Sequence, residues 1–268
     1  MSPSLVAAGP DLVLADFGPA RLSAAVIAVY LVVGEPFVGY VLHRRFEGRL
    51  RTDPAARRSF FRRLLVLEWG LALIALLVWI AAPGVGAAEV GLVLPQRWPG
   101  PVSWLAVAAL LVLVLVSTRA LRSGALAGPP PEALRRTRPG EARHAEPPGA
   151  ATLALLPRSR SERHLFALVG MTAGVCEEWL YRGFFLAVVV ALAPGLPAVV
   201  LVLVAAVAFG LAHAYQGTTG ILTTGVLGGV LAGVYLATGS LLLPVLLHAA
   251  IDLRFLLVPS SALPRTAT

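Results

Sequence analysis

The sequence contains no lysine, a single cysteine and few charged residues. All 22 basic residues among the 268 are arginine, which is typical of a GC-rich genome and points to a bacterium. The one cysteine, Cys176, excludes an intrachain disulfide and a cysteine-rich zinc site. Charged residues make up 13% of the chain, about half of the roughly 25% found in soluble domains. Together with a mean hydropathy of +0.81, this scarcity of charge predicts a polytopic membrane protein.

The formal net charge of +8 could suggest a nucleic-acid partner. The arginines, however, flank the apolar runs, where basic residues set membrane topology and meet anionic lipid headgroups. We therefore expect contact with anionic lipids and no nucleic-acid partner. The sequence does not indicate an oligomeric state.

The apolar runs predict an all-α transmembrane bundle of about seven helices, with an eighth if the fourth run is broken. Asp53 before Pro54 predicts an N-cap for the second helix, and Ser159 with Glu162 predicts a capping box for the fourth. Gly225, Gly229 and Gly233 should line one face of the sixth helix and permit close helix contact. The predicted helices cover about residues 22–42, 54–82, 102–116, 159–193, 197–213, 221–237 and 241–258.

The arginine-rich segments 43–63 and 119–163 are separated by 83–101, whose only basic residue is Arg97. The positive-inside rule therefore places the N-terminus outside and the C-terminus in the cytoplasm. If the chain is bacterial, the expected membrane is the plasma (inner) membrane. The start of the chain lacks a basic n-region, so no cleaved signal peptide is expected. The expected organisation is N-terminal helices with a basic cytoplasmic loop over 1–120, a flexible Pro/Arg-rich linker over 121–158, a helical core over 159–258 and a tail over 259–268.

Two adjacent carboxylates and an arginine, Glu177, Glu178 and Arg182, lie inside a long apolar segment. One charge at the centre of a bilayer costs at least ~2.5 kcal/mol on insertion scales, so such residues are normally paired and functional. Glu178 and Arg182 are four residues apart on one helix face and should pair, whereas Glu177 points elsewhere. An unpaired carboxylate in a low-dielectric site is suited to act as a general base or acid. The alternative is that both glutamates are structural.

Two histidines lie in the later spans. His213 follows Phe209 by four residues, so ring and imidazole should share a helix face. His248 precedes Asp252 by four, and this carboxylate is expected to accept a proton from the imidazole and fix its tautomer. A lone intramembrane histidine is commonly a structural hydrogen-bonding group, but two histidines with a glutamate pair indicate a site.

The depth of these residues is consistent with one site. Glu177 should lie ~18 Å from the cytoplasmic edge, and His248 ~20 Å from it. His213 would reach the same depth only if residues 214–220 dip into the membrane and line a cavity. Glu35 and Glu68 could line that cavity, but we expect them to face other helices or the headgroups.

The motifs resemble those of the CPBP family, the type 2 CAAX prenyl proteases and Abi-like intramembrane endopeptidases. Glu177 to Arg182 matches the EExxxR motif, Phe209 to His213 the FxxxH motif, and His248 to Asp252 the HxxxN/D motif. Leu156-Pro157, Glu162-Arg163 and Phe166 also resemble the approach to the first motif. The likeness covers about residues 153–258 and leaves the first three helices outside.

The resemblance implies an all-helical membrane protease whose cavity opens towards the cytoplasm. Glu177 would activate the attacking water with help from His213, and Glu178, His248 and Asp252 would complete the polar site. Arg182 would hold Glu178, with Phe209 as structural support. Many members have asparagine where this chain has Asp252, which is a poorer donor to an oxyanion.

The resemblance leaves the cofactor and the substrate open. Either Glu177 and His213 activate water without a metal, or Glu177, His213 and His248 hold one divalent ion such as zinc; the chain has no HExxH motif. The expected partners are membrane-embedded or lipid-modified proteins or peptides, either CAAX-type or bacterial. The alternatives are a proton-coupled transporter, for which no internal repeat is found, and a non-catalytic immunity or interaction protein.

Overall fold

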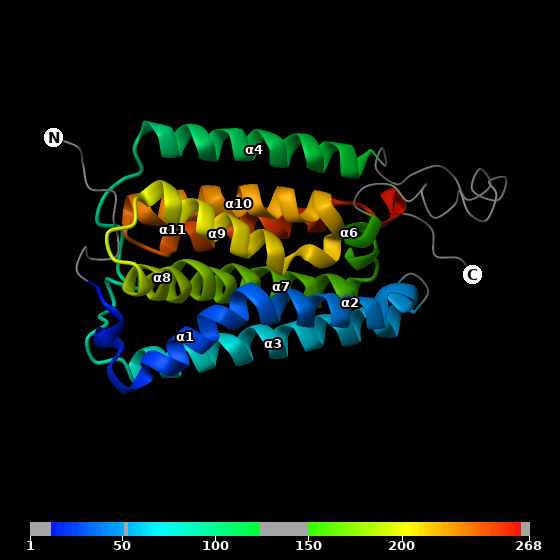
Figure 1. Cartoon of the computed structure of the whole chain (residues 1–268). Helices are drawn as coiled ribbons and strands as arrows, with labels where there is room; N and C mark the ends of the chain where they lie inside the picture. Colours follow the sequence, from blue (N-terminus) through cyan, green and yellow to red (C-terminus); the bar gives the residue numbers. More distant parts are fainter. Residues whose placement is uncertain (1–11, 51–52, 124–149, 264–268) are drawn as a thin grey trace.

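The computed structural model describes residues 12–50, 53–123 and 150–263, and every regular element within these ranges is helical (Figure 1). The all-α fold expected from the sequence is therefore confirmed for the described part of the chain. The helices are α1 Arg21–Val29, α2 Glu35–Leu50, α3 Pro54–Ile80, α4 Pro101–Arg122, α6 Ala150–Leu155, α7 Arg160–Glu178, α8 Leu186–Leu192, α9 Ala198–Ala212, α10 Gly217–Thr238 and α11 Leu242–Leu253.

Two pairs of helices join into continuous rods through π-helical turns. The turn Tyr30–Gly34 connects α1 to α2, and the turn Trp179–Phe185 connects α7 to α8. The fourth helix expected from the sequence is thus unbroken over 160–192. The described residues form seven long rods and the short α6, in agreement with the expected number of about seven helices.

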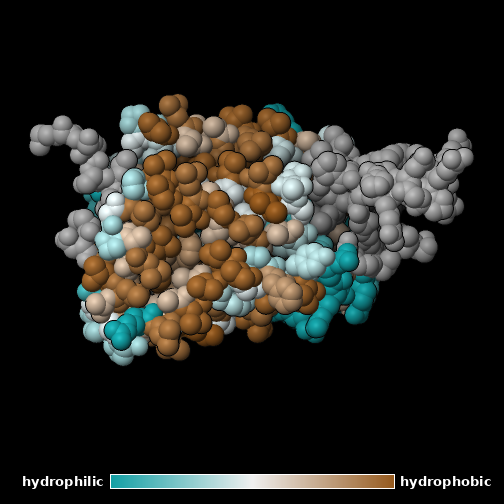
Figure 2. Space-filling view, viewed as in Figure 1, coloured by the Kyte–Doolittle hydropathy of each residue, from teal (hydrophilic) through white to brown (hydrophobic). Residues whose placement is uncertain are grey.

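Four rods are long and apolar enough to cross a membrane, and α9 is apolar but only 15 residues long. Figure 2 shows a broad hydrophobic surface across the middle of the molecule and hydrophilic residues gathered mainly at one end. The chain is therefore an integral multi-pass membrane protein. The four candidate spans are Leu14–Phe46, Ala55–Ile80, Pro101–Arg122 and Ala214–Thr238.

The rods lie roughly side by side in layers (Figure 1). The α1–α2 rod and α3 form one side, the α7–α8 rod with α9, α10 and α11 forms the centre, and α4 lies on the opposite side. The junction of α2 with α3 and the last turn of α4 lie at the same end of the bundle, on the right in Figure 1. The end of α2 and the start of α3 lie within the arginine-rich segment 43–63, and the end of α4 lies within 119–163. The side of the membrane that these ends face stays a prediction.

Both helix starts expected from capping signals are confirmed. The Asp53 side chain accepts a hydrogen bond of 2.8 Å from the backbone N–H of Ala55 at the start of α3. At the start of α7, the Ser159 hydroxyl accepts from the N–H of Glu162, and the Glu162 carboxylate accepts from the N–H of Ser159. These bonds satisfy backbone donors that a helix leaves free in its first turn.

The expected linker over 121–158 is only partly described. Its proline-rich middle falls within 124–149, outside the described residues, and its flexibility stays a prediction. Residues 150–155, however, form α6, and Leu153 and Leu156 are buried. The end of the expected linker is therefore part of the packed structure, because Leu153 and Leu156 belong to one hydrophobic cluster with Val258 and Leu263.

Glycines set the distance between the central helices. A Cβ at Gly174 of α7 would lie 2.9 Å from the backbone nitrogen of Ala249 in α11. A Cβ at Gly225 of α10 would lie 3.2 Å from the carbonyl oxygen of Ala206 in α9. The close contact expected from the glycine spacing is confirmed at Gly225 and Gly229, whereas nothing lies within 4 Å of a Cβ at Gly233.

Candidate active site

The acidic motif lies where α7 changes into a π-helical turn. Glu177 and Glu178 are the last two residues of α7, and Arg182 lies within the turn Trp179–Phe185. Spacing alone predicted a regular helix here and missed the turn. A π-turn inserts an extra residue into an α-helix and is frequent at functional sites.

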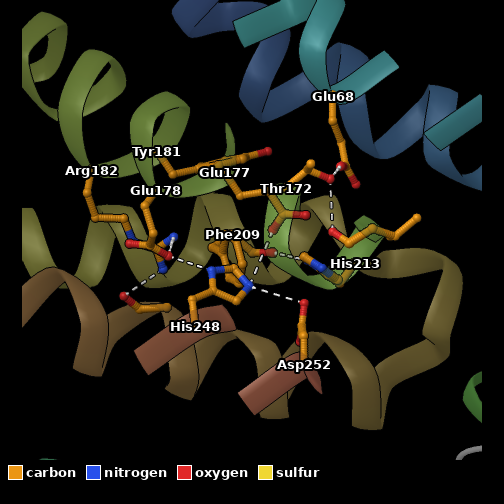
Figure 3. Close-up of polar contacts among 12 residues, drawn as sticks. Glu68, Thr172, Glu177, Glu178, Tyr181, Arg182, Phe209, His213, His248 and Asp252 are labelled. Atoms are coloured by element: carbon orange, nitrogen blue, oxygen red, sulfur yellow. Dashed lines mark hydrogen bonds and ion pairs between the residues drawn. The ribbon is translucent and has the colours of Figure 1, made fainter. Parts of the chain in front are cut away.

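Glu178 is a buried carboxylate with two charged or ionisable partners. Its Oε1 accepts a hydrogen bond of 2.9 Å from Arg182 Nη1 and one of 2.7 Å from His248 Nδ1. Arg182 is also fully buried and donates through Nη2 to the carbonyl oxygen of Gly228 in α10 at 3.2 Å. The expected pairing of Glu178 with Arg182 is confirmed, and it links α7, α10 and α11 (Figure 3).

The hydrogen bond expected between His248 and Asp252 is not made, although the two side chains lie within ion-pair distance. His248 Nδ1 bonds Glu178 rather than Asp252, whose Oδ2 lies 3.8 Å from Nε2 on the other side of the ring (Figure 3). That distance is too long for a hydrogen bond. The sequence misled because four-residue spacing within one helix was the only contact it could suggest, while Glu178 lies 70 residues away.

Glu177 lies on the Nε2 side of the same histidine. Its Oε2 is 3.9 Å from His248 Nε2, and this buried oxygen has no hydrogen-bond partner among the described residues. Adjacent glutamates therefore have different surroundings. Glu178 Oε2 likewise has no partner among the described residues, but Glu178 Oε1 is fixed by two short bonds, while Glu177 Oε2 only approaches His248 Nε2.

Phe209 connects the buried arginine to both histidines. Its ring centroid lies 4.3 Å from the guanidinium carbon of Arg182, 4.7 Å from the His213 ring and 5.7 Å from the His248 ring. Its backbone oxygen lies 2.9 Å from His213 Nδ1. The expected sharing of one face by Phe209 and His213 is confirmed.

A cavity of about 240 Å³ opens beside these residues. α9 ends at Ala212, and the turn Ala214–Gln216 that follows contributes Tyr215 and Gln216 to the cavity wall. The expectation that this segment lines a cavity is confirmed, although α10 already begins at Gly217. The polar or ionisable side chains lining the cavity are Tyr30, Glu35, Glu68, Glu177, Tyr181, His213, Tyr215, Gln216 and Asp252.

Glu35 and Glu68 line this cavity, which was the less favoured of the two possibilities, and each also contacts another helical rod, as expected. Glu35 Oε2 accepts a hydrogen bond of 3.1 Å from the hydroxyl of Tyr181. Glu68 Oε2 accepts one of 3.3 Å from the hydroxyl of Thr172. The rarity of intramembrane carboxylates was the signal that could have found both residues. Helices α2 and α3 therefore contribute directly to the site.

The structure brings all seven sequence-predicted residues into one region: Glu177, Glu178, Arg182, Phe209, His213, His248 and Asp252. Glu178 and Arg182 form its buried support, and Glu177, His213 and Asp252 line the cavity. Within the described ranges, no group of three or more histidine, cysteine, aspartate or glutamate side chains has an arrangement suited to a metal ion.

The fold and this site define a helical membrane protein with an intramembrane cavity of carboxylates and histidines. The family model of the type II CAAX prenyl endopeptidases, Rce1-like, matches residues 160–254, which include all three motifs. Residues 160–254 match the domain of this endopeptidase family, and the resemblance found from the motifs is confirmed over these residues. Comparisons with curated proteins and with solved structures gave no match.

Proposed function

We propose that the protein is an intramembrane endopeptidase in which Glu177 activates the water that attacks the peptide bond. The difference between the two glutamates carries this proposal. Glu178 is committed through Oε1 to Arg182 and His248, whereas Glu177 lines the cavity together with His213. The Oε2 atoms of both carboxylates have no hydrogen-bond partner among the described residues, so the position at the cavity is what distinguishes Glu177. A general base must reach water and substrate, and of the two only Glu177 meets that condition.

His213 is suited to assist Glu177. The carbonyl oxygen of Phe209 can only accept a hydrogen bond, so His213 Nδ1 must carry the hydrogen between them. In the neutral imidazole, Nε2 then holds the lone pair. His213 can therefore accept a hydrogen bond from water or orient it towards the substrate.

The reaction needs one water and one peptide bond. Glu177 takes a proton from water, the hydroxide oxygen bonds to the carbonyl carbon, and the C–N bond breaks. The proton passes from Glu177 to the departing nitrogen, which leaves as an amine. Glu178 and Arg182 hold His248 in place during these steps, and Nε2 of His248 faces the cavity carboxylates Glu177 and Asp252.

The proposed substrates are membrane-associated proteins or peptides. They either carry CAAX-type tails or are bacterial membrane proteins and peptides without such tails. The description of the matched family supports a prenylated tail as substrate. The absence of lysine from the chain, which is typical of a GC-rich bacterial genome, supports bacterial peptides instead.

The arginine-rich segments next to the helix ends support an orientation with the N-terminus outside and the C-terminus in the cytoplasm. The arginines would then lie against anionic lipids.

Zinc or another divalent ion is the alternative mechanism. Glu177, His213 and His248 would be its ligands, and the ion would polarise the attacked carbonyl or activate the water. The hydrogen bonds already made by both Nδ1 atoms leave only the Nε2 atoms for such an ion. We favour direct activation of water by Glu177.

Membrane proteomics tests the function while the substrate is still unidentified. Cells that carry wild type, Glu177→Gln or Glu89→Gln are compared, since Glu89 lies in the segment between α3 and α4 and does not line the cavity. We expect uncut forms of one or more membrane proteins to accumulate with Glu177→Gln alone. Purified wild type should then cut these proteins in liposomes. Identical proteomes, or equal cutting by wild type and Glu177→Gln, contradict the proposal.

The same cells separate the two other hypotheses. If the protein is a non-catalytic immunity or interaction protein, a Glu177→Gln, His213→Ala double variant still complements cells that lack the protein. A proton-coupled transporter gives substrate-dependent proton flux in liposomes even when proteolysis is inhibited. The endopeptidase family match favours proteolysis over both.

A further inference from the structure

Tyr181 connects the N-terminal helices to the candidate site. Its hydroxyl lies 3.1 Å from Glu35 Oε2 and 3.3 Å from the carbonyl oxygen of Leu31. Leu31 belongs to the π-helical turn before α2, and Glu35 is the first residue of α2. Tyr181 itself belongs to the π-helical turn after α7, and it is 1% exposed. The hydroxyl therefore joins two irregular helical turns that are about 150 residues apart in sequence.

The ring of Tyr181 transmits this contact to the histidines. It packs edge-on against Phe209, with 5.3 Å between the ring centroids. Phe209 in turn contacts the His213 ring and holds His213 Nδ1 through its backbone oxygen. The His248 ring packs edge-on against the same phenyl group. Although Tyr181 also borders the cavity, its ring is in direct contact with Phe209, so we expect a tilt of Tyr181 to move Phe209.

We propose that Glu35 is a positioning residue of the site, which fixes Tyr181 and, through the Phe209 ring, the orientation of His213. This inference rests on the proposed function for its effect on catalysis. It gives the N-terminal helices a defined role, since Glu35 lies outside the matched residues 160–254. Glu35 acts through Tyr181, and its required property is an oxygen that accepts the phenol hydrogen.

The position of Glu35 explains why a carboxylate is kept inside the membrane. A buried phenol hydroxyl needs a partner, and the Leu31 carbonyl alone would hold it at 3.3 Å. Glu35 offers a shorter contact from a second direction and restricts the ring to one tilt. At metal sites, outer contacts that orient the ligands typically change affinity or activity by roughly 10- to 100-fold when they are removed, and we expect an effect at the lower end of that range here.

The test compares Glu35→Ala, Glu35→Gln, Tyr181→Phe and the double variant Glu35→Ala, Tyr181→Phe. Tyr235→Phe is the matched control, because Tyr235 is an equally buried tyrosine of α10 whose hydroxyl donates to the backbone oxygen of Glu89. The first measurement is NMR of ¹⁵N-histidine-labelled protein in micelles, with the His213 resonances assigned from a His213→Gln variant. This measurement needs no substrate.

We expect the His213 resonances to shift in Glu35→Ala and in Tyr181→Phe, and to stay in place in Tyr235→Phe. Glu35→Gln should resemble wild type, because its amide oxygen still accepts from Tyr181. Unchanged His213 resonances in Glu35→Ala overturn the inference. So does a Glu35→Gln spectrum as altered as that of Glu35→Ala, because the acceptor oxygen would then not be the property that matters.

Kinetics with an internally quenched peptide that ends in a prenylated cysteine and three further residues give the second measurement. We expect kcat to fall about tenfold in Glu35→Ala and in Tyr181→Phe, with KM changed less than about twofold. The double variant should lose no more than the worse single variant, because both changes break the same connection. The inference is overturned if the loss of kcat in the double variant equals the product of the two single losses. It is also overturned if the variants change KM alone. A wild type that does not cut the peptide counts against that substrate, while the histidine spectra still decide the role of Glu35.

Discussion

Arg57 and Glu162, which are 105 residues apart, form a buried ion pair where α3 meets the start of α7. Arg57 Nη2 lies 3.1 Å from Glu162 Oε1, and the two side chains are 2% and 0% exposed. The same carboxylate accepts from the backbone N–H groups of Arg158 and Ser159 through Oε2. One side chain thus caps α7 and attaches it to α3.

Glu162→Gln is expected to destabilise the protein strongly. Removing one partner of a buried ion pair typically costs about 3–5 kcal/mol, because the charge that stays buried loses a stabilising contact. The measurement is reversible unfolding in mixed detergent micelles, with labelling of the single buried thiol, Cys176, as the readout. Asp53→Asn is the matched control, because Asp53 pairs with Arg49 at the exposed surface and asparagine also caps helices. Equal stability of the two variants would contradict the importance of burial.

The surroundings of the Glu162 carboxyl group predict how the stability of the fold depends on pH. Burial alone would raise the pKa of its carboxyl group, but hydrogen bonds from Arg158 and Arg57 outweigh it and hold the pKa below the ordinary value of 4.5. A lowered folded pKa means that the carboxylate stabilises the fold above the ordinary pKa. This stabilisation is lost as the pH falls through the folded pKa. Between about pH 5 and 3, wild type should therefore lose more stability than Glu162→Gln; parallel curves for the two proteins would contradict this.

The adjacent glutamates of α7 should differ in what their substitution damages. Glu178→Gln weakens the buried bonds to Arg182 and His248 and should lower both stability and activity. Glu177→Gln breaks no hydrogen bond of Oε2 and should leave stability close to wild type. It should lower kcat by ~100-fold or more, as expected for loss of a general base. Thermal unfolding and peptide cleavage on both variants give the comparison, and a strong loss of stability in Glu177→Gln would oppose the assigned roles.

Local spacing accounts for what the sequence could predict about the fold and the site. The cap at Asp53, the capping box at Ser159 and the pair Glu178–Arg182 all join residues two to four positions apart. Such contacts follow from the geometry of a single helix. Apolar runs likewise located the membrane helices, because a bilayer demands about 20 apolar residues in a helical span.

Contacts between helices could not be predicted in this way. The bond between His248 and Glu178 and that between Tyr181 and Glu35 depend on how the rods pack, and spacing says nothing about packing. The π-helical turns at Tyr30–Gly34 and Trp179–Phe185 were also missed, because the spacing of residues in a sequence does not distinguish a π-helical turn from a regular α-helix. Sequence reasoning consequently gave Asp252 the hydrogen bond with His248 that Glu178 makes, whereas Asp252 only comes within ion-pair distance.

Removal of metal ions tests the alternative mechanism. We expect prolonged dialysis against a chelator to leave cleavage unchanged, because direct activation of water by Glu177 uses no metal. Added zinc should then not increase the rate above that of the untreated protein. Loss of activity on chelation, with recovery on addition of zinc and with zinc found in the purified protein by elemental analysis, would favour the metal-dependent mechanism.

Gly174 permits the approach of α7 to α11 that brings Glu178 to His248. Its Cβ position lies 2.9 Å from Ala249 N and 3.1 Å from the carbonyl oxygen of Val245, and backbone cannot give way as a side chain can. Gly174→Ala should therefore push the helices apart, cost about 1–3 kcal/mol as overpacking does, and lower kcat by weakening the bond at His248. Gly233→Ala is the control, because its Cβ meets open space and alanine favours the helix. Wild-type stability and cleavage in Gly174→Ala would mean that the site tolerates a wider helix separation.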